Sequence, residues 1–345
     1  MIGIRELARH LDISIGTVSR ALNNKADVNP QTRERVREAA ARLGYSPNQS
    51  GRSLRRGQTD LVGVLIPTGS DHSLISNVFL SVLDGLRQSL SAQGLDLAIF
   101  LHGPDEDVFQ SLRRIAERSL ADGLIISNTR RIESRIDYLT EKRRAFVAFG
   151  RSESGGSHAW IDPDFEDAVQ GAVEQIAALG HRRVMLVLPD AETNFLAIIA
   201  DTFMRAMRRH GCEVANEPIL RRPAGERGGA EAAEALLAMR PRPTALLVSD
   251  SMQAVGLYRR FDEAGLKVGR DVAVIGILPE ARAEALTPTL ATYQTDWTEI
   301  GVRLGDALAV EIARMAGASP RRLERPTQLL MPVTFRPGES LQGTG

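Results

Sequence analysis

The chain has 345 residues, of which 43% are hydrophobic and 25% charged, so it can bury a large core and divide into several folded units. Its single cysteine, Cys212, excludes an internal disulfide and a cysteine-based metal cluster. The sequence contains no run of eighteen apolar residues, and its N-terminus lacks the apolar core of a signal peptide. We therefore expect a cytoplasmic protein in a reducing compartment.

Charge is unevenly distributed along the chain. Lys and Arg together number 43, and Asp and Glu also number 43. Residues 1–59 nevertheless carry eleven basic and five acidic side chains, a net charge of +6, so residues 60–345 carry −6. A basic segment of this kind suits binding to a phosphate backbone.

Three short helices are predicted within residues 4–45. The segment "IRELARHL" places its apolar residues on one face, and a short break, "DIS", precedes the next helix. The third helix has Asn29 as its N-cap, Pro30 in its first position and Gly44 beyond its end. Two helices joined by so short a turn form a helix-turn-helix, whose second helix enters the major groove of DNA.

The second helix lies within "SIGTVSRALN", residues 14–23, with Ser14 as its N-cap. At 100° per residue, Val18, Ala21 and Leu22 share one face. The opposite face and its margins carry Ile15, Gly16, Thr17, Ser19, Arg20 and Asn23. Glycine costs about 1 kcal/mol relative to alanine inside a helix, but a bare backbone allows a close approach to DNA. An ordinary amphipathic surface helix is the alternative.

From residue 61 onward, short apolar runs alternate with helix-length segments. This alternation predicts parallel sheets covered on both faces. The number of units favours two doubly wound subdomains, dividing near Ile161, with the chain crossing back near residues 290–295. The predicted strands are 61–66, 95–100, 123–127, 145–149, 183–188, 244–249 and 271–276, and the predicted helices include 76–92, 165–179, 226–239, 251–264 and 296–315.

Motifs for catalysis and for cofactor binding are missing from the sequence. It contains no G-x-G-x-x-G, P-loop, H-E-x-x-H or C-x-x-C motif, and "GRSES" lacks the second glycine of a nucleophile elbow. The histidines show no helical pairing, and we interpret His181 as a packing residue. We therefore predict no catalytic residue, no metal site, no cofactor and no enzymatic activity.

The order of these segments resembles the LacI/GalR family of bacterial transcription regulators, of the lactose-repressor type. The resemblance is most specific over residues 4–57, including "TVSRALNNKADVNPQTRERVREAAARLGYSPN" and "RSLRRGQTDLVGVLIP", and continues through "ALGHRRV" to "ALLVSDSMQAVGLYRRFDEAGLKVGRDVAVIG". It implies an all-α helix-turn-helix domain followed by a periplasmic-binding-protein-like pair of α/β subdomains. The implied boundaries are 1–45 for the DNA-binding domain, 46–59 for a hinge, and 60–345 for an effector-binding and dimerisation domain, with subdomain 1 at 60–160 and 295–323 and subdomain 2 at 161–294 and 324–337.

The resemblance assigns DNA contacts to matching positions. Ile15 and Gly16 fall where operator preference varies, and Thr17, Ser19 and Arg20 fall on positions that contact phosphates and bases. The segment "SPNQSGRSLRRGQT" resembles a hinge helix with Leu54 as a minor-groove wedge between Arg52 and Arg55. Gly51 stands where an alanine is usual and should make this hinge harder to fold. A flexible tether is the alternative.

The resemblance also implies a small effector held between the subdomains. Two departures put a conventional sugar in doubt, because Ile199 occupies the position of the family's arginine and Leu278 and Pro279 replace an acidic pair. The remaining pocket candidates are Phe79, Arg151, Asp164, Ser249 and Trp297. Each has a structural alternative, such as a helix cap for Asp164, a core position for Phe79 and an ion pair for Arg151.

We therefore expect a homodimeric repressor that binds a palindromic operator of a metabolic operon for carbohydrate use and responds to a sugar-like or other small effector. The C-terminal segment lacks the heptads of a tetramerising coiled coil. A solute-binding protein and a small-molecule enzyme with the same α/β body are the alternatives.

Overall fold

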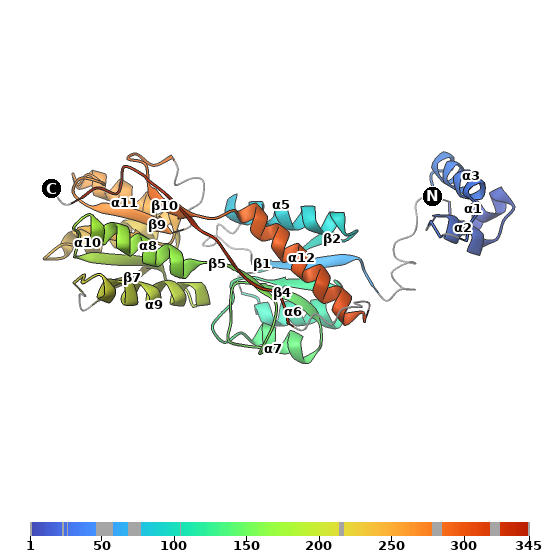
Figure 1. Ribbon diagram of the computed structural model, residues 1–345, viewed down its shortest axis with the longest axis horizontal. Helices are drawn as coiled ribbons and strands as arrows, with labels where there is room; N and C mark the ends of the chain where they lie inside the picture. Colours follow the sequence, from blue (N-terminus) through green and yellow to red (C-terminus); the bar gives the residue numbers. More distant parts are fainter. Residues whose placement is uncertain are drawn as a thin grey trace. The chain divides into compact units, whose positions relative to one another are not determined.

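The computed structural model describes residues 2–22, 24–25, 27–45, 58–67, 77–103, 105–213, 217–277, 285–317 and 325–343. The chain forms two compact units, Met1–Thr59 and Asp60–Gly345. Figure 1 labels their helices and strands. Among the described residues, no helix is both long and apolar enough to cross a membrane.

The first unit is a three-helix domain of α1 (Ile4–Leu11), α2 (Ile15–Leu22) and α3 (Pro30–Arg42). Its core includes Leu7, Val18, Ala21, Val28 and Val36, with contributions from all three helices. Oγ of Ser14 accepts a hydrogen bond from the Thr17 backbone N–H at 3.0 Å, and Oδ1 of Asn29 accepts one from the Gln31 N–H at 2.8 Å. Gly44 has φ +62°. The predicted helices and their caps are confirmed.

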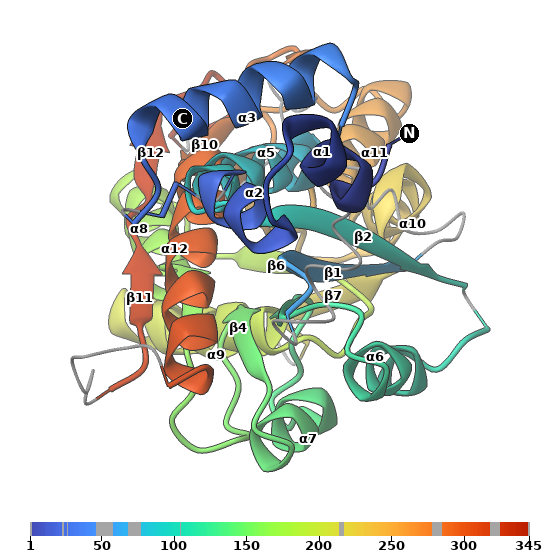
Figure 2. The ribbon, with the colours of Figure 1, turned by 90° about the vertical axis from the view of Figure 1, so that its right-hand side faces the viewer.

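The second unit contains two six-stranded sheets. The first sheet has the order β11-β5-β4-β3-β1-β2, and all its described pairings are parallel. Its strands are β1 (Leu61–Pro67), β2 (Asp96–His102), β3 (Gly123–Ile126), β4 (Ala145–Phe149), β5 (Trp160–Pro163) and β11 (Gln328–Met331). One face is covered by α5 (Asn77–Ala92) and α12 (Trp297–Met315), and the other by α6 (Val108–Glu117) and α7 (Ser134–Glu141), as Figure 2 shows.

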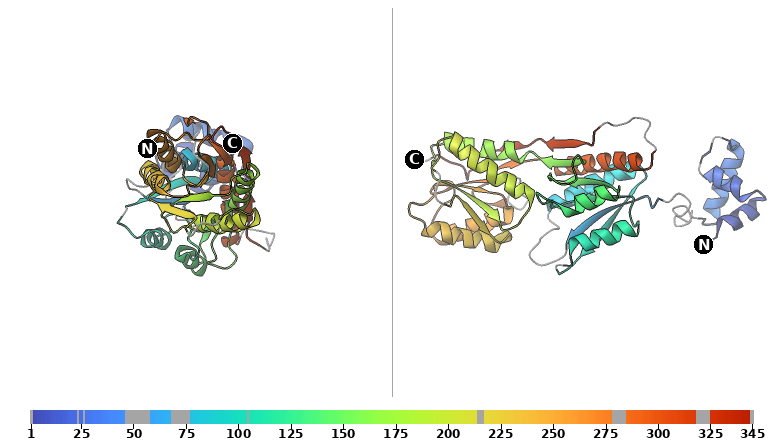
Figure 3. Two further views of the ribbon diagram at one scale, coloured as in Figure 1. Left: turned by 90° about the vertical axis from the view of Figure 1, so that its left-hand side faces the viewer. Right: turned by 90° about the horizontal axis from the view of Figure 1, so that it is seen from below.

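The second sheet has the order β12-β10-β9-β8-β6-β7, and β12 is antiparallel to β10. Its strands are β6 (Val184–Pro189), β7 (Ile219–Arg222), β8 (Ala245–Val248), β9 (Ala273–Ile277), β10 (Ala291–Gln294) and β12 (Thr334–Arg336). The helices α8 (Phe165–Ala178) and α9 (Asn194–Arg209) cover one face, and α10 (Gly225–Ala238) and α11 (Ser251–Glu263) cover the other (Figure 3, right).

Alternation along the strands explains these two layers of helices. In β6, Val184 and Leu186 join the core under α8 and α9, whereas Met185 and Val187 join the core under α10 and α11. Such strands are apolar on both faces and appear in the sequence as continuous apolar runs. The predicted class of doubly wound parallel sheets is confirmed, and all seven predicted strands are present with ends shifted by one or two residues.

The connections between the subdomains correct part of the predicted division. The chain crosses after β5, β10 and β11. The predicted second subdomain begins at residue 161 and includes residues 324–337. However, β5 lies in the first sheet, and β11 pairs with β5 in parallel, with Met331 opposite Pro163. Only β12 of that C-terminal segment joins the second sheet. Strand pairing is a long-range choice that the apolar pattern of "QLLM" does not encode.

Candidate nucleic-acid interface and ligand cleft

The outer face of α2 carries the side chains that the sequence analysis assigned to DNA. Val18 and Ala21 are completely buried, whereas Ile15 is 42% exposed. Gly16 and Arg20 are exposed, and Thr17 and Ser19 are half-buried on the flanks. Asn23 lies outside the described residues. The described part of α2 therefore has a packed apolar face and an accessible polar face.

Gly16 is not required by packing within the domain. A Cβ atom at this position would lie 3.6 Å from Nη1 of Arg20 and 3.7 Å from Oγ of Ser14, which are ordinary van der Waals distances. The backbone there is helical and needs none of the conformational freedom of glycine. Neither packing nor backbone conformation therefore requires a glycine at this exposed position of α2.

Arginines of this domain have two different environments. Nε of Arg20 lies 3.5 Å from Oδ2 of Asp27, and both side chains are more than half exposed, so the ion pair is weak and easily exchanged. Arg33 instead donates to the carbonyls of Lys25 and Val28 at 2.9 and 3.2 Å. Arg33 thus holds the turn between α2 and α3, while Arg20 stays accessible to a ligand.

The predicted hinge residues Arg52, Leu54 and Arg55, together with Gly51, lie outside the described residues. Leu278 and Pro279 of the predicted cleft also lie outside them. These predictions are not tested by the structure.

The predicted cleft residues lie at the carboxyl ends of strands or at helix starts, where ligands bind in open α/β sheets. Arg151 follows β4, Asp164 follows β5 and Ser249 follows β8. Phe79 lies in the first turn of α5 and is half-buried against the core of the first subdomain. Trp297 begins α12 and packs against the cores of both subdomains.

Arg151 is held by two carboxylates. Its Nε donates to Oδ2 of Asp162 at 2.8 Å, and its Nη1 and Nη2 donate to the two Glu166 oxygens at 2.9 and 2.6 Å. Burial raises the pKa of Asp162 to about 6, against the opposing effect of Arg151. Burial also acts to raise the pKa of Glu166, but the hydrogen bonds from Arg151 outweigh it and lower that pKa. These three hydrogen bonds fix the Arg151 guanidinium group against Asp162 and Glu166.

Hydrogen bonds join the two subdomains. Asn194, the first residue of α9, donates from its backbone N–H to the Thr129 carbonyl at 2.8 Å. Its side-chain Nδ2 donates to the Arg151 carbonyl at 2.8 Å. The same carbonyl accepts a hydrogen bond from the Thr129 hydroxyl at 2.9 Å. Thr129 and Asn194 are not among the predicted site residues, because no local sequence pattern marks them.

Two buried hydroxyl oxygens at the end of the second sheet have no hydrogen-bond partner among the described residues. They are Oγ1 of Thr193, after β6, and Oγ of Ser249, after β8, and these two strands are neighbours. Buried polar atoms are normally paired, so these two hydroxyl oxygens are exceptions to the usual pairing. Asp164 is used locally, because its Oδ1 caps α8 by accepting from the Asp167 N–H at 2.9 Å.

Other predicted features have structural roles. Ile199 is completely buried in the core under α8 and α9, so this position contributes no polar group to a ligand. Nε2 of the buried His181 donates to the Gln342 carbonyl at 2.7 Å, and its Nδ1 lies 3.0 Å from the Thr244 hydroxyl. This confirms His181 as a packing residue. Over the described ranges, no group of three His, Cys, Asp or Glu side chains could hold a metal ion.

Two family models match the chain. Residues 3–48 match "Bacterial regulatory proteins, lacI family", and residues 173–341 match "Periplasmic binding protein-like domain". The HTH-type transcriptional regulator RafR of Escherichia coli is 28% identical over 99% of this chain and 98% of its own length. The HTH-type transcriptional regulator AglR of Rhizobium meliloti is 28% identical over 89% of this chain and 87% of its own length.

Solved structures share the whole fold. The lac repressor dimer bound to operator and the anti-inducer ONPF has a TM-score of 0.83 at 21% identity, covering 99% of both chains. The complex of the transcriptional regulator CelR with cellobiose has a TM-score of 0.71 at 20% identity, covering 99% of this chain and 100% of the other. At these identities the likeness establishes the fold.

Proposed function

Because the chain is a LacI-family protein, with a lacI-type helix-turn-helix domain ahead of a periplasmic-binding-protein-like domain, we propose that it is a transcriptional repressor that binds a specific operator through α2. The observation that carries this proposal is the accessible face of α2 above its buried Val18 and Ala21. The basic charge of residues 1–59 supports it, because phosphate neutralisation supplies most of the nonspecific affinity for DNA.

In this proposal, α2 lies in the major groove. Arg20 exchanges Asp27 for the O6 and N7 acceptors of a guanine, an interaction worth about 1–3 kcal/mol of discrimination. Ile15 contacts a thymine methyl group, and Gly16 lets the helix backbone approach the base edges. The sequence-based assignment completes the surface with Thr17, Ser19 and Asn23.

Residues 46–59 would contact the minor groove. Leu54, the single large apolar side chain of the segment, would insert between base pairs and kink the duplex, while Arg52 and Arg55 pair with phosphates. Shortening Leu54 to alanine should then reduce DNA bending together with operator affinity.

We further propose that a small polar effector, such as a sugar derivative, binds between the subdomains. In this proposal the hydroxyls of Thr193 and Ser249, which are buried and unpaired among the described residues, become hydrogen-bonding partners of the effector, and Trp297, which packs against the cores of both subdomains, offers an aromatic ring. Phe79, Asp164 and Arg151 would complete the effector site. Closure of the subdomains around the effector would change the spacing of the two DNA-binding domains in a dimer.

A homodimer is supported by an exposed apolar surface on the first subdomain. Ile99 and Leu101 on the edge strand β2 are 50% and 62% exposed, and Leu80 on the neighbouring α5 is 47% exposed. Exposed apolar side chains on adjacent elements are typical of protein interfaces. Each protomer would read one half of a palindromic operator in the cytoplasm, and this activity requires no catalytic residue.

The test is selection of bound sequences from random duplex DNA, followed by binding measurements on the selected operator. Arg20→Ala should lower operator affinity at least tenfold while leaving weak salt-sensitive binding to unrelated DNA. Arg35→Ala removes the same charge from an exposed site on α3 and is the matched control, for which we expect less than a threefold loss. Equal operator affinity for Arg20→Ala and the parent would overturn the proposed role of α2.

A further inference from the structure

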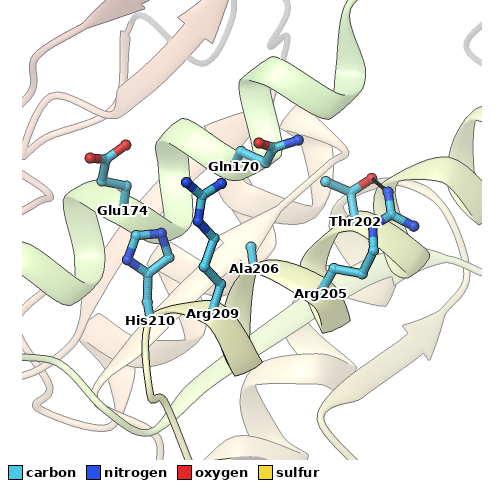
Figure 4. A pocket seen from close by; sticks show the side chains of 7 residues that line it. All are labelled: Gln170, Glu174, Thr202, Arg205, Ala206, Arg209 and His210. Atoms are coloured by element: carbon cyan, nitrogen blue, oxygen red, sulfur yellow. Dashed lines mark hydrogen bonds between the residues drawn. The ribbon is translucent and has the colours of Figure 1, made fainter.

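A polar cavity of about 300 Å³ lies between α8 and α9 in the second subdomain (Figure 4). The α8 wall is formed by Gln170 and Glu174, which are one helical turn apart and exposed. The α9 floor is formed by Thr202 and Ala206, which are 0% and 3% exposed. The small side chain of Ala206 keeps the space between the two helices open. The volume is at the lower end of those of small-molecule sites.

The α9 wall of this cavity is cationic. It carries Arg205, Arg209 and His210, whereas Glu174 is the single acidic residue among the described residues that line the cavity. Arg205 and Arg209 are one turn apart, so their Cβ atoms are separated by about 5–6 Å. Nη2 of Arg205 donates to Oγ1 of Thr202 at 2.8 Å, which directs this guanidinium along the floor.

Arg209 and His210 reach into the space below α8, toward Glu174 and Gln170 (Figure 4). Within the described part of the chain, neither side chain forms a hydrogen bond or an ion pair. Arginines in the last turn of α9 also complement the helix dipole, and this accounts equally for Arg208 and Arg209. The helix dipole does not explain why Arg209 lines the cavity whereas Arg208 does not.

We propose that this cavity binds a small phosphorylated polyol, at a site separate from the cleft between the subdomains. A phosphate monoester brings nearly two negative charges and three terminal oxygens to the two guanidinium groups, whereas a carboxylate brings one charge and two oxygens. The carboxylate of Glu174 and the amide oxygen of Gln170 then accept hydrogen bonds from hydroxyl groups of the ligand. An uncharged polyol lacks the group that the arginines recognise.

Calorimetric titration of the full-length protein with glycerol 3-phosphate tests this site. We expect saturable binding that is tighter than that of inorganic phosphate, and no measurable binding of glycerol. Arg209→Gln should weaken the binding of glycerol 3-phosphate at least tenfold. Arg208→Gln, a change of equal charge on an adjacent exposed residue that does not line the cavity, should weaken it less than twofold.

The absence of saturable binding would overturn the proposal, and so would equal losses from Arg209→Gln and Arg208→Gln, which would indicate nonspecific attraction. Binding that survives Arg209→Gln unchanged would place the ligand elsewhere, and would also overturn it. Operator affinity measured without phosphate should be the same for Arg209→Gln and the parent. The site can therefore fail while the proposed DNA-binding function stands.

Discussion

At the scale of single residues, Gly16 separates the requirements of folding from those of recognition. Its added Cβ would meet only ordinary contacts, so Gly16→Ala should stabilise α2 by up to about 1 kcal/mol. The same methyl group would stand between the helix and the base edges, so operator affinity should fall. Slower hydrogen exchange over residues 15–22, together with weaker operator binding, is the expected result. Unchanged operator affinity would show that Gly16 does not approach DNA.

A second residue-scale prediction concerns Asp162. Its pKa is raised from 3.8 to about 6, so the folded state holds this proton more tightly than the unfolded state. Stability contributed by the group is therefore fully present below about pH 4 and is lost as the pH rises through about 6. Asp162→Asn cannot titrate and should remove this loss between pH 5 and pH 7. Urea unfolding at pH 5 and at pH 7 measures the free energy of unfolding, and Asp105→Asn, at an exposed position, is the control.

At the scale of elements, α5 and α12 pack with their backbones in contact. A Cβ atom on Gly85 would lie 1.9 Å from the Thr298 carbonyl oxygen, and one on Gly301 would lie 2.0 Å from the Val82 carbonyl oxygen. Gly85→Ala must separate the helices and should lower the free energy of unfolding by about 1–3 kcal/mol. Urea unfolding should show no such loss for Ser91→Ala on the exposed side of α5. Equal urea midpoints for Gly85→Ala and Ser91→Ala would contradict the close packing of α5 against α12.

At the scale of the whole molecule, two protomers are needed to engage both halves of a palindromic operator. Leu101→Glu places a charge on the exposed apolar surface of β2 and should convert the dimer to monomers in sedimentation experiments. Operator affinity should fall with it, because the two half-sites no longer bind as one unit. Ile132→Glu is a matched control, since Ile132 is 66% exposed and Leu101 is 62% exposed. A Leu101→Glu variant that sediments as the parent does would exclude this surface as the interface.

Features that depend on near neighbours in the chain could be predicted from the sequence. Ser14 and Asn29 could be identified as caps, because a cap bonds an amide two or three residues away. The two faces of α2 follow from its 3.6-residue period, and buried parallel strands appear as continuous apolar runs. Repetition of these strands between helices was enough to predict two doubly wound sheets.

Contacts between distant residues could not be predicted in the same way. The pairing of β11 with β5 joins segments more than 160 residues apart, and Asn194 contacts a carbonyl 43 residues earlier in the chain. The two carboxylates that engage Arg151, and the cavity between α8 and α9, likewise depend on how elements pack after they form. Local periodicity fixes the face of each element, but it carries no information about the partner that the face will meet. That choice is made by the fit and hydrogen bonding of the complete fold.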